Sequence, residues 1–230
     1  MAEKTDITMD EARALVANTA LWPRVRDFLW DFAPQIHRSW IDGLEFLEPL
    51  EKLDNLDSQS ILGKPRVKRF VLSSLGVEPC FHTFPKEDMS RLLLLDGATL
   101  ESIVKWLGAL ACADDLRRVM DGKSVRRLKT ELPGIYPEVF TYVAYFRGID
   151  FQRRDAEAQS LGSQDVISAG VSILVSFLDH LPSPLVSRLN FKLPKDFCAS
   201  ASLRLKQEPC GKALARLLKL RFPEAYSLCC

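Results

Sequence analysis

The sequence lacks the short motifs that support most enzyme and cofactor chemistry. It has no GxxxxGK(S/T) or GxGxxG loop for a nucleotide, no HxxxH or HExxH pair for a metal, and no CxxC. Its three histidines, His37, His82 and His180, are far apart in the chain, so their spacing predicts no metal site. We therefore expect no cofactor, no bound metal and no small-molecule substrate.

A strong charge of one sign and a long apolar run are also missing. The formal net charge is +1, so no global field attracts nucleic acid or an acidic membrane. The longest apolar segment, residues 166–178, is shorter than the ~20 residues that cross a bilayer. We therefore expect no nucleic-acid partner and no direct membrane insertion.

Signals for export and for disulfide formation are absent as well. Residues 1–16 lack the basic and apolar regions of a secretory signal peptide. The six cysteines are scattered along the chain, which is typical of a protein whose thiols stay reduced. The sequence therefore predicts a protein of the cytoplasm without a disulfide framework.

The nearest approach to a catalytic pair is Cys80 and His82 in the segment EPCFHTF. A thiol beside an imidazole can act as a nucleophile, but no neighbouring residue is placed to orient this histidine. We expect no enzymatic activity, and a helical hydrolase or transferase that uses Cys80 and His82 is the alternative.

Helical periodicity dominates the middle of the chain. Between residues 100 and 111 the apolar side chains fall on one side of a helix, and Thr99 is placed to cap its start. The apolar side comprises Leu100, Ile103, Val104, Leu107, Leu110 and Ala111, and Glu101, Lys105 and Ala109 lie opposite. This pattern predicts a core-facing helix.

Three further short helices are predicted before residue 147. The first carries Asp114 and Asp115 ahead of its arginines, as the helix dipole favours, and is expected to end at Gly122. The second covers residues 123–132 and stops before a Pro-Gly pair, and the third covers residues 136–146. Short helices joined by tight turns indicate a compact helical unit.

A polar, glycine-containing stretch separates this unit from the apolar segment 166–178. That segment predicts a central core helix, with its serines gathered on one narrow side. Residues 44–62 are expected to be a loop or a weak helix. The sequence thus predicts an all-α protein without significant sheet, built of two packed lobes, residues 1–161 and 162–230, or of a single domain.

Two segments of the chain carry a resemblance to a known family. The run LDGATLESIVKWLGALACADDLRRVMDGKSVRRLK and the tail LLKLRFPEAYSLCC resemble the SctK family, of the YscK, PscK and MxiK type. The resemblance implies an all-helical adaptor of the type III secretion sorting platform in the bacterial cytoplasm. Its implied partners are the SctD-type inner-membrane ring protein and the SctQ-type pod protein. A chaperone-like binder of secreted proteins is the alternative, although such chaperones are typically small, acidic and dimeric.

Tryptophans near the amino terminus are candidate contact residues. Trp22 and Trp30 lie eight positions apart and could share one helix face. Core packing is the simpler interpretation of this pair, and anchoring of a partner is the alternative. Trp106 lies at the edge of the apolar side of its helix, which predicts a place at the rim of the core.

Basic side chains gather at two places that could contact a partner. The first group is Arg117, Arg118, Lys123, Arg126, Arg127 and Lys129, and the second is Lys212, Arg216 and Lys219 on a helix predicted over 211–222. Each group is either a solvated face or a docking surface for an acidic partner. The opposite side of the second helix carries Leu214, Leu217, Leu218 and Phe222, which would pack on the protein's own body or in a partner's groove.

Overall fold

A computed structural model describes residues 20–42, 44, 64–85, 88–147, 149, 162–198 and 207–229, and these residues form helices and turns without a β-strand. The α-helices are α2 (Trp22–Leu29), α3 (Arg38–Ile41), α6 (Pro65–Ser74), α7 (Gly97–Ala111), α8 (Ala113–Arg118), α9 (Gly122–Glu131), α10 (Val139–Tyr142), α11 (Ser163–Leu178), α12 (Ser183–Lys192), α13 (Lys195–Cys198), α14 (Gln207–Arg221) and α15 (Pro223–Cys229). Three 3₁₀ turns are η1 (Ala33–Gln35), η2 (Met89–Leu94) and η3 (Val143–Phe146). The predicted all-α fold is confirmed. Residues 44–62 were expected to be a loop or a weak helix, and apart from Leu44 they lie outside the described residues.

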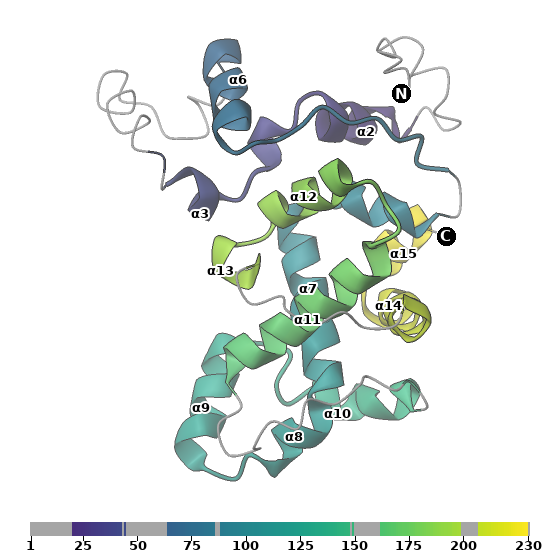
Figure 1. The fold of residues 1–230 in the computed structure, drawn as a ribbon. Helices are drawn as coiled ribbons and strands as arrows, with labels where there is room; N and C mark the ends of the chain where they lie inside the picture. Colours follow the sequence, from purple (N-terminus) through teal and green to yellow (C-terminus); the bar gives the residue numbers. More distant parts are fainter. Residues whose placement is uncertain are drawn as a thin grey trace.

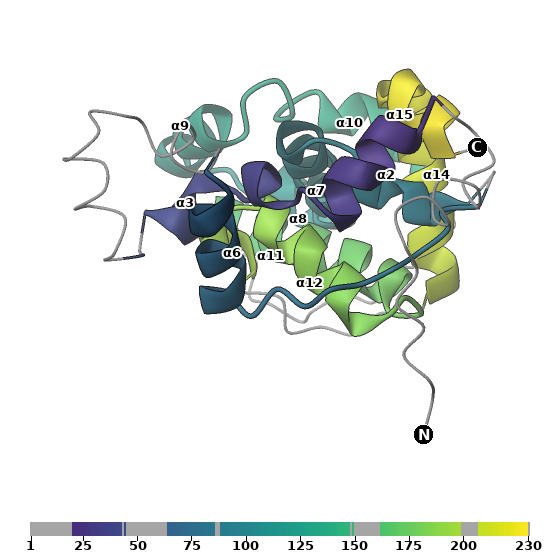
Figure 2. The same ribbon diagram turned by 90° about the horizontal axis from the view of Figure 1, so that it is seen from above.

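Helices α7 and α11 cross at the centre of the molecule, and the other elements pack around them (Figure 1). Figure 1 shows α2, α3 and α6 beyond one end of α7, and α8, α9 and α10 at its other end. The view from above shows α2 and α12 lying across the first of these ends (Figure 2). α7 is therefore the axis along which the rest of the fold is arranged.

The start of α7 differs from the sequence prediction. Asp96, not Thr99, is the N-cap, and its carboxylate accepts hydrogen bonds of 2.8 Å from both the backbone N–H and the hydroxyl of Thr99. Glu101 and Lys105, on the side opposite the apolar one, form an ion pair with Lys105 Nζ 2.7 Å from Glu101 Oε1. Ala109, predicted to face away from the core, is fully buried, since α7 is covered on more than one side.

Two boundaries around α9 and α10 also differ from the prediction. Gly122 does not end α8; it is the first residue of α9, because Asp121 accepts the Ser124 N–H at 2.8 Å and caps that helix. The helix expected from residue 136 begins only at Val139, after a turn in which the N–H of Tyr136 bonds to Leu132 O. The predicted stop of α9 before the Pro-Gly pair agrees with its last residue, Glu131.

Helix α11 is the central core helix that the sequence predicts. Its serine side is covered too, since Ser168, Ser172 and Ser176 are all buried along with most of its apolar residues. Gly162 caps its start, at the position expected for a boundary. Buried residues from both sides of Gly162 belong to one hydrophobic cluster, and the division into two lobes remains a prediction.

Two buried cations on α12 attach it to the amino-terminal elements. The Arg188 guanidinium donates to the carbonyls of Phe28 and Leu29, at the carboxyl end of α2, where the helix dipole favours positive charge. Lys192 Nζ donates 2.7 Å hydrogen bonds to the carbonyls of Leu93 and Leu95. Burial lowers the pKa of Lys192 to about 7.

Candidate functional site

The first basic group lies at the far end of α7, on the outer surface of α8 and α9. We call it the α8–α9 surface and define it by Arg117, Arg118, Met120, Lys123, Arg126, Arg127 and Lys129, all of which are exposed. The basic side chains noted in the sequence are therefore exposed, and their role in partner binding remains a prediction. Met120 joins them, with 91% of its surface exposed.

Half of the basic side chains on this surface are paired within their own helix. Arg117 lies 3.8 Å from Asp114, Arg118 lies 3.4 Å from Asp115, and Arg127 lies 2.8 Å from Glu131. Among the residues that the structure describes, no carboxylate lies within ion-pair distance of the other three, Lys123, Arg126 and Lys129. The surface therefore keeps positive charge available for a partner.

The second basic group lies on α14, whose apolar side packs on the body of the protein. Leu214, Leu217 and Leu218 are at most 1% exposed, so this helix contributes to the core. Arg216 is exposed and donates a 3.1 Å hydrogen bond to Tyr145 O. Packing of α14 on the chain itself is thus the interpretation that agrees with the structure, and a partner could reach only its basic side.

The carboxyl end of α14 covers Trp106. The Arg221 guanidinium lies 4.6 Å from the centre of the Trp106 ring, and it also pairs with Glu138 at 3.0 Å. Tyr142 packs edge-on against the same indole, with ring centres 5.4 Å apart. Trp106 is consequently buried, with 4% exposed, more deeply than the rim position predicted from its helix.

Trp22 and Trp30 lie together at the opposite end of the molecule, on and just after α2. Their ring centres are 5.8 Å apart, and the Trp30 ring is 6.5 Å from that of Phe81. Both tryptophans pack against the core and are only partly buried. The pair therefore packs on the core, and partner binding by it remains a prediction.

Comparison with known proteins decides the family of the chain. The family model described as "YOP proteins translocation protein K (YscK)" matches residues 27–230. The chain belongs to the YscK family of type III secretion proteins, which is the SctK family. No curated protein and no solved structure shows significant similarity to it.

The YscK match covers both basic groups and leaves out only the amino-terminal end, including Trp22. Residues 92–146, which carry the clearest resemblance, hold α7 and the α8–α9 surface. Within the described part of this YscK-family chain, no helix is both long and apolar enough to cross a membrane. The family match confirms the resemblance to the SctK family that the sequence showed.

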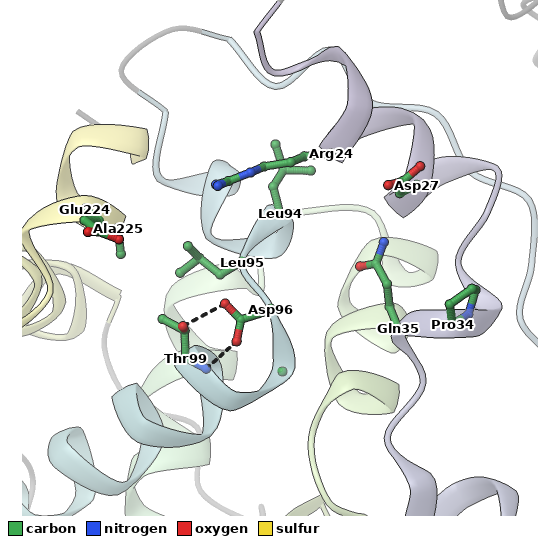
Figure 3. Close-up of a pocket in the computed structure, with 11 residues that line it drawn as sticks. Arg24, Asp27, Pro34, Gln35, Leu94, Leu95, Asp96, Thr99, Glu224 and Ala225 are labelled. Atoms are coloured by element: carbon green, nitrogen blue, oxygen red, sulfur yellow. Dashed lines mark hydrogen bonds between the residues drawn. The ribbon is translucent and has the colours of Figure 1, made fainter. Parts of the chain in front are cut away.

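The YscK-family chain also has an open pocket of about 510 Å³ between α2, η1, the start of α7 and α15 (Figure 3). Its polar lining includes Arg24, Asp27, Gln35, Asp96, Thr99 and Glu224. Partial burial tends to raise the pKa of Asp96, but the hydrogen bonds from Thr99 outweigh it, so this pKa lies below its ordinary value. Its described lining residues include no cysteine, serine or histidine, and the Thr99 hydroxyl is hydrogen-bonded to the Asp96 carboxylate, which caps α7.

Cys80 and His82 do not form the pair considered from the sequence. His82 Nε2 lies 3.2 Å from Ser90 Oγ, and the imidazole packs edge-on against Phe84. Burial raises the pKa of the Cys80 thiol and lowers the pKa of His82. Among the described residues, no three His, Cys, Asp or Glu side chains are grouped as metal ligands would be.

Proposed function

We propose that this protein is a non-enzymatic adaptor of the type III secretion sorting platform. In this proposal it links the cytoplasmic domain of the SctD-type ring protein to the SctQ-type pod protein, at the cytoplasmic face of the inner membrane. The single observation that carries the proposal is the YscK-family match over residues 27–230. The same match disfavours a chaperone-like binder of secreted proteins.

The arrangement of the candidate surfaces supports a linking role. An adaptor needs two contact regions that can be occupied at the same time. Helix α2, which begins at Trp22 and is followed by Trp30, and helices α8 and α9 lie beyond opposite ends of α7 (Figure 1). A helix of 15 residues rises about 20 Å, so two partners at these ends need not collide.

The environment of Cys80 supports a role without catalysis. A cysteine nucleophile acts as the thiolate, and burial raises the pKa of this thiol, which keeps it protonated at neutral pH. Ser90, the hydroxyl that does contact His82, is 1% exposed. A substrate would therefore have to reach a covered hydroxyl or an un-ionised thiol.

Pairwise binding tests the proposal. The purified chain is mixed separately with the cytoplasmic domain of the ring protein and with the pod protein of the same secretion system, and each mixture is measured by calorimetry. We expect binding to both partners. Binding to neither would remove the proposed function, and binding to only one would remove the linking role.

A further inference from the structure

Met120 is an apolar residue whose side chain is exposed to solvent, although an apolar residue at this position can pack against the helix that follows. It comes directly before Asp121, the N-cap of α9. An apolar residue at this position commonly packs against the fourth helical residue, here Val125, and forms a hydrophobic staple. Met120 remains 91% exposed, so the staple is absent and the side chain is available to another molecule.

The corner that carries Met120 is fixed on both sides. Asp121 accepts hydrogen bonds of 2.8 Å from the N–H and from the hydroxyl of Ser124, which fixes the start of α9. Leu116 of α8 and Leu128 of α9 are each 1% exposed, so both helices are anchored in the core. Because the backbone of this corner is already ordered, binding there requires no loop ordering, and the entropy lost is that of the Met120 side chain.

The positive charges beside Met120 are arranged against local stability. Lys123 and Arg126 are three residues apart on α9, and Lys123 and Arg127 are four apart, so all three share one exposed side. Like charges at these spacings destabilise a helix by about 0.2–0.5 kcal/mol per pair. Of the three, Arg127 alone is in ion-pair contact with a carboxylate of the described residues, and Lys123 interacts electrostatically with Asp121. A helix side that only contacts water could alternate positive and negative charges and avoid this cost.

We propose that Met120 and the exposed side of α9 form a docking surface for an acidic protein surface with an apolar recess, into which Met120 inserts. This inference rests on the proposed function, because it assigns the surface to the ring protein or the pod protein. Methionine is enriched in interface cores and arginine among hot-spot residues. A folded protein fits better than a lipid surface, because one apolar side chain gives little membrane affinity.

Four variants of the full chain test the docking surface: Met120→Glu, Met120→Leu, Arg126→Glu and Leu220→Glu. Leu220 is another exposed apolar residue beside basic side chains, so its variant controls for an added carboxylate. Affinity for the ring domain, for the pod protein and for phosphatidylglycerol vesicles is measured for each. Because these side chains are exposed, all four variants should melt at the wild-type temperature.

We expect Met120→Glu to weaken binding to one of the two proteins by at least about tenfold, with the other unaffected. Met120→Leu should bind as the wild type does, and Arg126→Glu should slow association, most strongly at low salt. Leu220→Glu should change nothing.

Wild-type binding of both proteins by Met120→Glu would overturn the docking surface and leave the proposed function standing. If Met120→Glu and Leu220→Glu weakened binding equally, the loss would come from the added charge alone, and the docking surface would again be overturned. A loss confined to the vesicles would assign the surface to lipid instead. If the wild type bound neither protein, the proposed function itself would fail, and the docking surface with it.

Discussion

Gly108 of α7 and Gly170 of α11 face each other where the two helices cross, and a side chain on either would collide with the backbone of the other helix. A Cβ atom on Gly108 would lie 1.8 Å from the carbonyl oxygen of Val166, and one on Gly170 would lie 1.9 Å from that of Val104. Each would also lie 3.0 Å from the backbone nitrogen of the opposite glycine. The two central helices therefore touch backbone to backbone, and their crossing depends on both glycines.

Replacing Gly108 by Ala should force the central helices apart. We expect Gly108→Ala to lower the free energy of unfolding by about 1–3 kcal/mol, because the added methyl group meets a backbone carbonyl that cannot move alone. The matched control is Gly122→Ala, at a helical glycine with no atom within 4 Å of the added methyl. Urea unfolding followed by circular dichroism measures both. Equal stabilities of the two variants would contradict the close crossing.

Lys192 should make stability depend on pH. Its pKa is about 7 in the folded chain, below the ordinary value of 10.5, so between these values the unfolded chain binds more protons. The free energy of unfolding therefore rises with pH in this window, by up to about 1.4 kcal/mol per pH unit. Below pH 7 both states carry the proton, and this contribution becomes constant.

The comparison of Lys192→Met with Lys129→Met isolates that contribution. Methionine cannot titrate, so Lys192→Met should show a smaller rise in stability between pH 7 and pH 10 than the wild type. Lys129 is exposed, and its replacement should leave the slope unchanged. Urea midpoints across the pH range supply the measurement. A wild-type slope in Lys192→Met would show that this lysine remains charged in the fold.

Removal of residues 211–230 should prevent folding. The deletion takes away Leu214, Leu217 and Leu218, each fully covered, and such a loss costs about 2–5 kcal/mol per residue. Together these amount to about 6–15 kcal/mol, which is comparable with the whole net stability of a typical domain, about 5–15 kcal/mol. Solubility and circular dichroism of the shortened chain check this. A stable product that no longer binds a partner would instead make α14 an interface, and one that still binds both would make the tail dispensable.

Replacement of Cys80 and His82 by Ala should leave secretion intact. Neither side chain has a catalytic task in an adaptor, and the imidazole contacts Ser90 and not the thiol. Secretion by a strain that carries the double variant provides the measurement, with the melting temperature of the purified chain as control. Loss of secretion with normal folding and normal partner binding would support the hypothesis that the protein is an enzyme.

Helical periodicity predicted α7, α9, α11 and α14 because burial of one side of each helix leaves a regular trace in the sequence. Helix ends were harder, since neighbouring residues compete to cap them. Asp96 and Thr99 can both accept the first N–H groups of α7, and the aspartate takes this role. Gly122 could end one helix or begin the next, and the Asp121 carboxylate decides for the second.

Contacts between segments that are distant in the sequence account for the structural features that the sequence did not predict. The sequence does not indicate the burial of Arg188 and Lys192, because only the folded chain brings backbone carbonyls of α2 and η2 within reach of them. The close crossing had a signal in the sequence, because a glycine inside an apolar helical pattern often marks close packing. Met120 also had a signal in the sequence, as an apolar residue in a turn directly before a basic helix.

The composition of the three-component mixture tests the adaptor account most directly. The chain, the cytoplasmic domain of the ring protein and the pod protein are combined, and the mass of the eluting complex is measured by light scattering after gel filtration. The account predicts one complex that contains all three proteins, and no complex of the ring domain with the pod protein when this chain is left out. Separate binary complexes in which one partner displaces the other would contradict it.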